Sequence, residues 1–595
     1  MNNLYLFQPQ FAVEVRRETN YWLPYSAGCL WSYVQQFPEI KLNFDLKDIV
    51  FRREPLEEVI ARMQEPKLCG FCCYLWNEKY CLALAQAIKQ QWPGCVIIFG
   101  GPQANSQMTK YNFIDTIVMG EGEEIFLDIL QGLLKNKQPE IFYSKKRLEQ
   151  LEIPSPYTLG LFDSMIQQNP LAKWSMVLET NRGCPYECTF CDWGGVTYSK
   201  IKKFDIKKVH DDLEWAVDKP VEYLFCADAN FGIFKERDVE IASLIRNAAD
   251  RGNIEAVALQ YAKNSTEYVF KIAQIMGDIG RGVTVSVQSM NTDTLEAVKR
   301  KNMAVNNMCK IMQLSEQYNV PTYTEVILGL PEETMETWKQ GLCDLLSVGQ
   351  HYNIDVWFSI LLANSELSTI DSRRKYGLKT VMAQYSGIFN LEDSNNILEE
   401  TEIISGTNTM TLDEMIESYM YAWMIIHFHV SGYTQIIARW YNNVLNVSYR
   451  DYYDRLFVVL QQSQTLSKHF NYLRDTVKQY LQTGTIPSEF NSSHNLHAVS
   501  YEFLYNNRKI IYDVALNVAE EFFPVPSNVI TLQQNFIYDV EQQFPICVDA
   551  DVNFYTGEHN NCSYTLTSKI EPNTVFDFYM HRRKGYLKNH ISMVM

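Results

Sequence analysis

Short apolar runs alternate with amphipathic stretches over the first 150 residues of the chain. The apolar runs cover Leu4–Phe7, Leu68–Leu75, Cys95–Phe99 and Thr116–Met119. Tyr80–Gln91 and Ile125–Leu134 instead carry apolar side chains at helical spacing. Short strands that alternate with helices are typical of a parallel sheet covered on both faces. The pattern therefore predicts an α/β, doubly wound, Rossmann-like domain over residues 1–150, with ligands beyond the carboxyl ends of its strands.

The same alternation continues through the middle of the chain after Pro154 and Pro156. Six predicted strands cover Trp174–Glu179, Tyr223–Ala227, Ala256–Gln260, Val283–Gln288, Tyr323–Leu328 and Val356–Leu362. The predicted helices cover Phe204–Val217, Asp238–Ala249, Glu267–Met276, Thr294–Lys301, Val305–Tyr318 and Met335–Leu346. Six strand–helix units indicate a partial (β/α)6 barrel over residues 151–365, with functional groups at the carboxyl ends of the strands.

From residue 366 to residue 595 the pattern becomes mainly helical. Long helical patterns cover Met410–Tyr441, Tyr452–Leu481 and Tyr501–Phe523, and Val529–Phe576 is predicted to be a small tail that contains β-strands. An aromatic and histidine group lies in the first of these helices: Trp423, His427, His429, Tyr433 and Trp440. Packing between helices explains this group most simply, and lining of a substrate cavity is the alternative.

Composition restricts the compartment and the partners of the protein. A chain of 595 residues requires two to four domains. Its net charge of −17 makes nucleic acid an unlikely partner, because phosphate backbones require a basic face. Neither a signal peptide nor an apolar run long enough to span a membrane is recognised, so we expect a cytoplasmic protein without membrane attachment. The 14 cysteines are then expected to be reduced and available for metal.

Three of these cysteines form a motif directly after the first predicted strand of the barrel. Cys184, Cys188 and Cys191 have the spacing C-x3-C-x2-C, with Phe190 before the last cysteine. Three thiolates can hold three irons of a [4Fe–4S] cluster and leave one iron open. This motif resembles that of the radical S-adenosylmethionine (SAM) enzymes. The resemblance implies that SAM chelates the open iron and that an electron from the cluster cleaves it, usually to a 5′-deoxyadenosyl radical.

Polar residues follow the other predicted strands of the barrel. By position, the resemblance implies that SAM contacts Asp228, Gln260, Gln288, Ser289 and Gly329. Helix capping is the more probable role of three further residues at these ends, Ser265, Asn291 and Thr334.

The predicted strand ends of the first domain carry motifs similar to those of the cobalamin-binding domain that precedes the barrel in one branch of this family. The resemblance implies that cobalamin contacts Leu75, Trp76, Asn77, Gly100, Gly101, Pro102, Gly120, Glu121, Gly122 and Glu123. The first histidine of the chain is His210. Cobalt would therefore have water, another side chain or nothing as its lower ligand.

Together these resemblances imply a cobalamin-dependent radical SAM methyltransferase that uses a [4Fe–4S] cluster, SAM and methylcobalamin. We expect it to methylate an unactivated carbon of a small molecule or peptide, with an electron donor such as flavodoxin or ferredoxin. No catalytic side chain is singled out. One alternative is a cyclase or rearrangement enzyme of the anaerobic tetrapyrrole ring-forming type. The other is a non-catalytic sensor of cobalamin or redox state.

Overall fold

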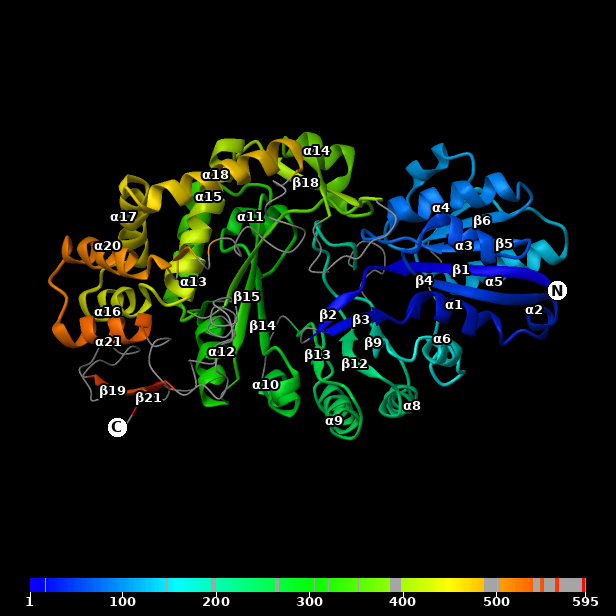
Figure 1. The fold of residues 1–595 in the computed structure, drawn as a ribbon, viewed down its shortest axis with the longest axis horizontal. Helices are drawn as coiled ribbons and strands as arrows, with labels where there is room; N and C mark the ends of the chain where they lie inside the picture. The colour runs from blue at the N-terminus through cyan, green and yellow to red at the C-terminus, as the bar shows by residue number, and fades with distance from the viewer. Residues whose placement is uncertain are drawn as a thin grey trace.

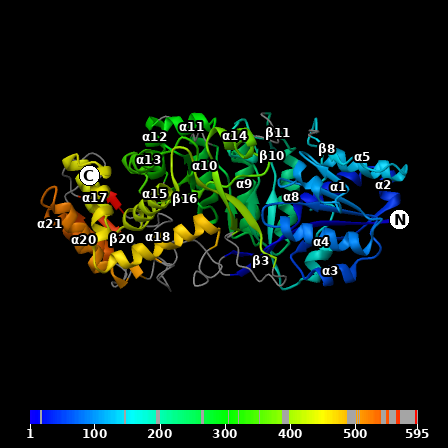
Figure 2. The same cartoon turned by 90° about the horizontal axis from the view of Figure 1, so that it is seen from above.

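A computed structural model describes residues 1–15, 18–144, 148–193, 200–262, 267–303, 305–318, 320–351, 353–385, 397–485, 500, 503–504, 506–538, 546–550, 562–566 and 591–593. The molecule is elongated (Figures 1 and 2). An N-terminal sheet lies at one end, the barrel strands lie in the middle, and helices α17, α20 and α21 lie at the other end. The predicted order of the three parts along the chain is therefore also their order in space.

The N-terminal sheet has six parallel strands in the order β4-β1-β5-β6-β7-β8. Their bounds are β1 (Asn2–Gln10), β4 (Phe44–Arg52), β5 (Leu68–Cys72), β6 (Val96–Gly100), β7 (Thr116–Val118) and β8 (Phe142–Tyr143). The helices are α1 (Tyr25–Val34), α2 (Pro38–Asn43), α3 (Leu56–Arg62), α4 (Glu78–Gln91) and α5 (Glu123–Leu134), with a short turn η1 (Ser106–Lys110). The four predicted strands and both predicted helices are present, and the charged edge strand β4 was not anticipated.

Side chains of β1 alternate between the two faces of this sheet. Leu4 and Leu6 belong to one apolar core and Tyr5 and Phe7 to another. A strand that is buried on both faces lies in the middle of a doubly wound sheet. The switch in strand order lies between β1 and β5, and this is where such domains bind ligands.

A hairpin from the N-terminal region joins the barrel instead of this sheet. Strands β2 (Val13–Val15) and β3 (Glu18–Trp22) pair with each other, and β3 pairs in parallel with β9 (Lys173–Leu178), with Tyr21 opposite Trp174. Part of the backbone of the first 150 residues therefore extends the barrel sheet.

All six predicted barrel strands are present, in two parallel groups. After β9 they are β12 (Val221–Cys226), β13 (Ala256–Ala258), β14 (Val283–Gln288), β15 (Thr322–Leu328) and β16 (Ile354–Phe358). The helices are α8 (Ile206–Val217), α9 (Glu236–Arg251), α10 (Glu267–Met276), α11 (Thr292–Ala297), α12 (Val305–Gln317) and α13 (Met335–Ser347), with the short elements α6 (Asp163–Gln168), β10 (Asn181–Arg182), β11 (Lys202–Lys203) and η2 (Gly277–Ile279). The predicted α/β barrel is confirmed.

The barrel sheet is interrupted between β13 and β14. One group has the order β13-β12-β9-β3-β2 and the other β14-β15-β16, and the bridge between them joins Val257 to Gly280. Helix α11 is also shorter than predicted, because Lys299 adopts a φ of 52° and ends the helical path.

The C-terminal third begins with the hairpin of β17 (Lys379–Gln384) and β18 (Glu400–Gly406), preceded by η3 (Glu366–Ser368) and α14 (Ile370–Lys375). The helices are α15 (Leu412–Met424), the π-helical turn η4 (Ile425–Val430), α16 (Gln435–Leu445), α17 (Tyr449–Gln462), α18 (Leu466–Thr483), α20 (Arg508–Glu520) and α21 (Ser527–Tyr538). Strands β19 (Ile546–Ala550), β20 (Cys562–Leu566) and β21 (Ile591–Met593) form the last sheet, and the rest of the predicted tail lies outside the described residues.

Each of the first two predicted long helices is divided into shorter ones. The pattern over residues 410–441 becomes α15, η4 and α16, with a turn at Gly432, whose φ is 91°. In the part of the chain that the structure describes, no helix combines the length and apolar character needed to cross a membrane.

Candidate active site

The cysteine loop leaves β9, and Asp228 anchors its first residues from the end of β12. Asp228 is fully buried. One carboxylate oxygen accepts backbone N–H groups of Thr180 and Asn181 at 2.8 and 3.0 Å. The other accepts Thr180 Oγ1–H and, at 2.6 Å, an N–H of Asn181 Nδ2. Four donors of the protein therefore surround a carboxylate that the sequence assigned to SAM.

These contacts give Asp228 a structural role, because it binds the backbone and side chains at the start of the cysteine loop. Burial raises the pKa of Asp228 to about 7, and the hydrogen bonds from Thr180 and Asn181 act in the opposite direction. An unpaired buried carboxylate costs several kcal/mol, so these donors are what stabilise it here. Asp228 holds the turn from which the cysteine loop starts.

The three thiols lie in surroundings that suit an iron–sulfur cluster. Cys184 and Cys188 are buried and Cys191 is partly exposed. Asn230 Nδ2 donates a hydrogen bond to Cys184 Sγ at 3.3 Å. Hydrogen bonds to the sulfurs tune the reduction potential of such clusters. Asn230 lies two residues after Asp228, so residues that follow β12 bind both the start of the cysteine loop and its first thiol.

Arg300 supplies positive charge to the other two thiols. Its guanidinium donates to the carbonyl of Ser286 and lies beside Cys188 and Cys191. Burial lowers the pKa of Arg300, and the two cysteines raise it. A cation favours thiolate over thiol. The early end of α11 at Lys299 is what turns Arg300 toward the cysteine loop.

The donor set suits an iron–sulfur cluster. Among the residues described, no three His, Cys, Asp or Glu side chains converge on one point as a single metal ion requires. In a cubane cluster each thiolate binds a different iron, so the three sulfurs stand apart. Three cysteines on one loop, a hydrogen-bond donor and a buried cation meet that requirement.

The guanidinium of Arg182 joins the cysteine loop to the N-terminal domain. Its Nη1 donates to Glu123 Oε1 at 2.9 Å. Its Nε and Nη2 donate to the two oxygens of Glu179 at 2.8 and 3.0 Å. Burial lowers the pKa of Arg182, but Glu123 and Glu179 outweigh this effect and raise it well above its ordinary value. Glu123, a predicted cobalamin contact, therefore pairs with a residue two positions before Cys184.

The remaining predicted SAM residues lie at the ends of their strands. Gln260 is partly exposed, and its carbonyl accepts the N–H of Phe231 at 2.7 Å. Gln288 is buried with a φ of 67°, which is strained for a side chain other than glycine. Gly329 has a φ of 96°, and a Cβ there would approach Met415 Cε to 3.1 Å. Gly329 therefore also permits close packing of the C-terminal third on β15.

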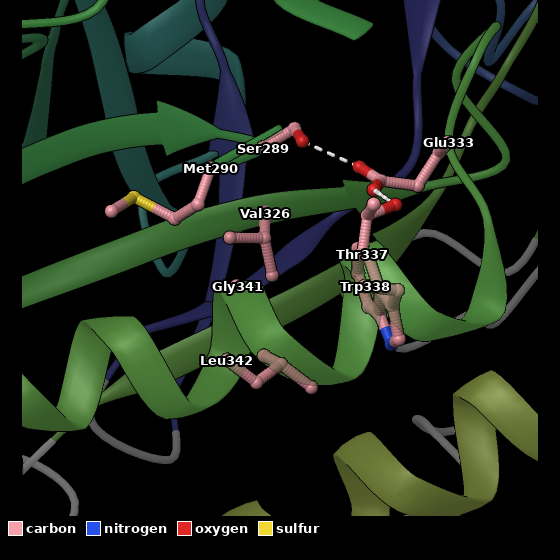
Figure 3. Close-up of a pocket in the computed structure, with 8 residues that line it drawn as sticks. All are labelled: Ser289, Met290, Val326, Glu333, Thr337, Trp338, Gly341 and Leu342. Carbon is pink, nitrogen blue, oxygen red and sulfur yellow. Dashed lines mark hydrogen bonds between the residues drawn. The ribbon is translucent and has the colours of Figure 1, made fainter. Parts of the chain in front are cut away.

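Ser289 is held from outside the barrel by a buried carboxylate. Figure 3 shows Ser289 Oγ donating to Glu333, which also accepts a hydrogen bond from Thr337 Oγ1 at 2.6 Å. These residues line a small pocket between the strands and α13, together with Met290, Val326, Trp338, Gly341 and Leu342. Thr334 caps α13 and Asn291 caps α11, as predicted, whereas Ser265 lies outside the described residues.

The loop after β5 carries three of the predicted cobalamin residues. Asn77 is buried; its Nδ2 donates to the carbonyls of Pro9 and Cys72 at 3.0 Å, and its Oδ1 accepts the N–H of Tyr74 at 2.7 Å. Leu75 is partly exposed. Trp76 stacks on Tyr74 with ring centroids 4.5 Å apart, and its buried Nε1–H has no partner among the described residues. The loop is thus rigid and presents an indole donor at the switch point.

The glycine motifs after β6 and β7 bring the backbone close to neighbouring loops. Gly101 has a φ of 99°, and a Cβ there would lie 2.7 Å from the carbonyl of Cys73. Gly100 and Pro102 flank it, and the carbonyl of Pro102 accepts an N–H of Asn364 at 2.8 Å. In the next motif, Gly120 has a φ of 97°.

Two carboxylates of this second motif are engaged within the protein. Glu121 accepts the N–H of Leu148 at 2.6 Å, and Glu123 pairs with Arg182 as described above. Gly122 lies between them at the start of α5, and a Cβ there would lie 3.1 Å from Leu30. Contact of these three residues with cobalamin is a prediction that the structure does not test.

A residue from the C-terminal third caps the helix that follows Trp76. Glu399 accepts the N–H groups of Lys79 and Tyr80 at 2.8 and 3.0 Å, at the first turn of α4. Its carboxylate also pairs with Arg53, which donates to the carbonyl of Trp76 at 3.1 Å. The C-terminal third therefore helps to hold the candidate cobalamin loop.

Sequence reasoning missed several of these residues. Arg182 was visible as a cation inside the cysteine loop, and Asn230 as an amide two residues after Asp228. Arg300 and Glu399 had no local signal, because their importance depends on partners distant in sequence. The C-terminal aromatic and histidine group is buried throughout, which agrees with a role in core packing.

The comparisons with known proteins agree with this site. The Radical SAM superfamily model matches residues 178–342, which begin at the end of β9 and include the three cysteines. The chain is 32% identical over 460 residues to the 2-(S-pantetheinyl)-carbapenam-3-carboxylate methyltransferase of Streptantibioticus cattleyicolor, covering 73% of this chain and 67% of the relative. It is also 32% identical over 461 residues to the cobalamin-dependent radical SAM methyltransferase TokK of Streptomyces tokunonensis, with the same coverage.

A solved structure supports the fold. The apo form of the cobalamin-dependent S-adenosylmethionine radical enzyme OxsB matches with a TM-score of 0.51 at 13% identity, covering 91% of this chain and 80% of that one. The fold and the cysteine motif define a radical SAM enzyme. More specifically, the chain belongs to the cobalamin-dependent radical SAM methyltransferases. The predicted cofactors, a [4Fe–4S] cluster, SAM and cobalamin, are confirmed at the level of the family.

Proposed function

We propose that this methyltransferase transfers a methyl group to an unactivated carbon of a small molecule at the junction of its barrel and its N-terminal sheet. The ion pair between Arg182 and Glu123 carries this proposal. It joins the cysteine loop to the strand-end motif that resembles a cobalamin site, so cofactors held at these two places would face a common space.

The residues present suit both groups. Cys184, Cys188 and Cys191 would hold the cluster, with Asn230 and Arg300 stabilising their charge. When bound, the cluster supplies the electron that cleaves SAM, and cobalamin carries the methyl group. The chain itself fixes the position of both groups and limits the access of water, which are the usual contributions of a protein to cofactor chemistry.

For cobalamin, we propose contacts with the loop of Leu75, Trp76 and Asn77 and with the glycine motifs at residues 100–102 and 120–123. The unpartnered Nε1–H of Trp76 supports this assignment, because a buried donor without an acceptor is costly unless a ligand supplies one. No histidine precedes His210, so a histidine of this domain cannot be the lower ligand of cobalt.

For SAM, we propose contacts with Gln260, Gln288, Ser289 and Gly329, with Asp228 acting through the cysteine loop. Gln288 is the strongest candidate of this set. Its strained backbone at the end of β14 persists only where surrounding structure enforces it, and such strain gathers at functional sites.

The substrate and the reductant are inferred from the relatives and the compartment. The first compound to test is 2-(S-pantetheinyl)-carbapenam-3-carboxylate, the substrate in the name of the relative from S. cattleyicolor. We propose that the protein works in the cytoplasm and receives electrons from a flavodoxin or ferredoxin. A peptide substrate remains the second candidate.

The test is anaerobic turnover with this compound, a chemical reductant and SAM that carries a labelled methyl group. The expected product is heavier by one labelled methyl group. A product of unchanged carbon count with fewer hydrogens would instead show a cyclase. Loaded enzyme that produces neither 5′-deoxyadenosine nor S-adenosylhomocysteine would contradict catalysis by this chain.

A further inference from the structure

The inner face of β15 and β16 carries a carboxylate and an exposed indole for which the proposed cofactor sites give no role. In β15, Val326 points outward, because it lines the pocket against α13 in Figure 3. Successive side chains of a strand alternate, so Glu325 and Ile327 point into the barrel. In β16, Phe358 packs outward on Tyr419 of α15, with ring centroids 5.1 Å apart. Trp357 therefore also points inward, and register pairs it with Ile327.

Trp357 is unusually accessible for a barrel strand. It is 46% exposed, whereas Ile354 on the outward face is fully buried. Exposed tryptophan on a concave surface is typical of sites that bind a partner or ligand, because it offers a large apolar area with little loss of conformational entropy. The inner face of β16 is thus open to a ligand.

Glu325 is a partly buried carboxylate on the same inner face, opposite Asp355 and two residues below the level of this indole. It accepts no hydrogen bond from the residues that the structure describes. Burial raises the pKa of Glu325, and the neighbouring charge of Asp355 adds to this effect, whereas Arg281 and Arg300 act in the opposite direction. A carboxylate in this position is costly unless something donates to it.

Both neighbouring cations are already engaged elsewhere. Arg281 donates to Asp355 at 2.6 Å and lies over the ring of Tyr323 at 4.1 Å. Arg300 donates to Ser286 and faces the cysteine thiols. Among the residues described, Glu325 therefore has charged neighbours but no hydrogen-bond donor.

Aromatic rings cover the facing wall. Trp22 of β3 contacts Tyr223 and Phe225 of β12, with ring centroids 5.7 and 6.3 Å apart. Tyr223 also interacts electrostatically with Tyr323, which lies on the inner face of β15. A ligand between the two walls would meet apolar surface on one side and Glu325 with Trp357 on the other.

We propose that Glu325 and Trp357 bind the non-reacting end of the substrate, and that this end carries an N–H-donating nitrogen, an amine or amide, on an apolar body. The proposal rests on the proposed function. Glu325 lies three residues before Leu328, where β15 ends, which places it about 10 Å below the strand ends. Binding so far from the reacting carbon would orient the substrate without touching the chemistry.

The test uses the anaerobically reconstituted full-length enzyme and two probes of similar shape and opposite charge, tryptamine and indole-3-propionate. Affinities are measured by calorimetry or by saturation-transfer NMR. We expect tryptamine to bind more tightly than indole-3-propionate. Glu325→Gln should weaken tryptamine about tenfold or more, because it removes a charge-assisted hydrogen bond.

Two further variants keep this test decisive. Trp357→Leu should weaken both probes, since it removes the stacking surface but no charge. Glu240→Gln, a change of the same kind on the exposed face of α9, should leave both affinities unchanged. Tryptamine that fails to bind, or that binds equally to Glu325→Gln, would overturn the proposal.

Failure of this proposal can be told apart from failure of the methyltransferase assignment. If Glu325→Gln has no effect on either probe while the enzyme methylates its substrate, only the binding proposal is wrong. If the probes behave as expected but no methyl group is transferred, only the substrate or reaction assignment is wrong.

Discussion

At the scale of single residues, the site depends on charges placed beside the three thiols. Asn230 donates to Cys184, and Arg300 lies beside Cys188 and Cys191. The charge around an iron–sulfur cluster and the hydrogen bonds to its sulfurs set how easily it is reduced. We therefore expect these two side chains to influence how easily the cluster is reduced.

Arg300→Gln should leave the cluster bound but make it harder to reduce. Removal of a nearby positive charge destabilises the reduced, more negative cluster. We expect the midpoint potential to fall by about 50 mV or more, equivalent to roughly 1 kcal/mol for one electron. An EPR-monitored redox titration measures this shift, with Arg251→Gln on the surface as the control. An unchanged potential would show that Arg300 has only a packing role.

At the scale of elements, the helix after the candidate cobalamin loop depends on a distant carboxylate. Glu399 caps α4 and pairs with Arg53, and both side chains of this pair are almost fully buried. Loss of one partner of a buried pair leaves an uncompensated charge, which typically costs 3–5 kcal/mol. The loop that presents Trp76 is therefore stabilised by a residue of the C-terminal third.

Glu399→Gln should accordingly destabilise the protein by about 3 kcal/mol and weaken the retention of cobalamin. Chemical denaturation and the cobalamin content after gel filtration measure these effects. The double variant Arg53→Met with Glu399→Met should recover part of the stability, because it leaves no buried charge. If the single and double variants are equally unstable, then capping of α4, and not the ion pair, is the dominant contribution.

Most elements of the fold were predictable, because their patterns are local. Alternation of apolar runs and helical stretches predicted the six barrel strands and four strands of the N-terminal sheet. β4 was missed because Asp45, Lys47 and Asp48 interrupt its apolar run, and an edge strand tolerates such charges. The break at Gly432 and the pairing of β3 with β9 depend on tertiary contacts, which a local pattern does not contain.

The candidate site also contains some residues that local sequence patterns reveal and others that depend on distant contacts. The three cysteines could be recognised from their spacing because all three lie on one loop, and their role as cluster ligands stays a prediction. Contact of Asp228 with SAM stays a prediction, and its four donors from Thr180 and Asn181 could not be foreseen, since they depend on the register of β9 and β12. Arg300 lies 109 residues after Cys191 in the sequence, and Glu399 lies 320 residues after Lys79. Local sequence patterns do not reveal contacts over such separations.

At the scale of the whole molecule, the guanidinium of Arg182 connects the two parts that are proposed to hold the cofactors. Arg182 is partly buried between Glu179 at the end of β9 and Glu123 at the start of α5. The ion pair fixes the cysteine loop relative to the N-terminal sheet. Positioning errors of about 1 Å can reduce a rate 100-fold, so this connection matters more for coupling than for binding.

Arg182→Gln should therefore uncouple SAM cleavage from methyl transfer. We expect the ratio of methylated product to 5′-deoxyadenosine to fall about tenfold, while iron and cobalamin contents change little. Arg182→Lys keeps the charge but loses the forked geometry. Its ratio of methylated product to 5′-deoxyadenosine should therefore lie between the ratios of the wild type and Arg182→Gln. Parallel loss of both products would show instead that Arg182 supports the cluster alone.

We infer that one chain holds an iron–sulfur cluster and cobalamin on separate frameworks. This inference is tested by the metal and cofactor content of the anaerobically reconstituted protein and of the variant in which Cys184, Cys188 and Cys191 are all replaced by Ala. We predict about four irons and one cobalamin for the natural chain, and cobalamin without iron for the variant. Iron that survives the triple replacement, or a natural chain that binds no cobalamin, would contradict this inference.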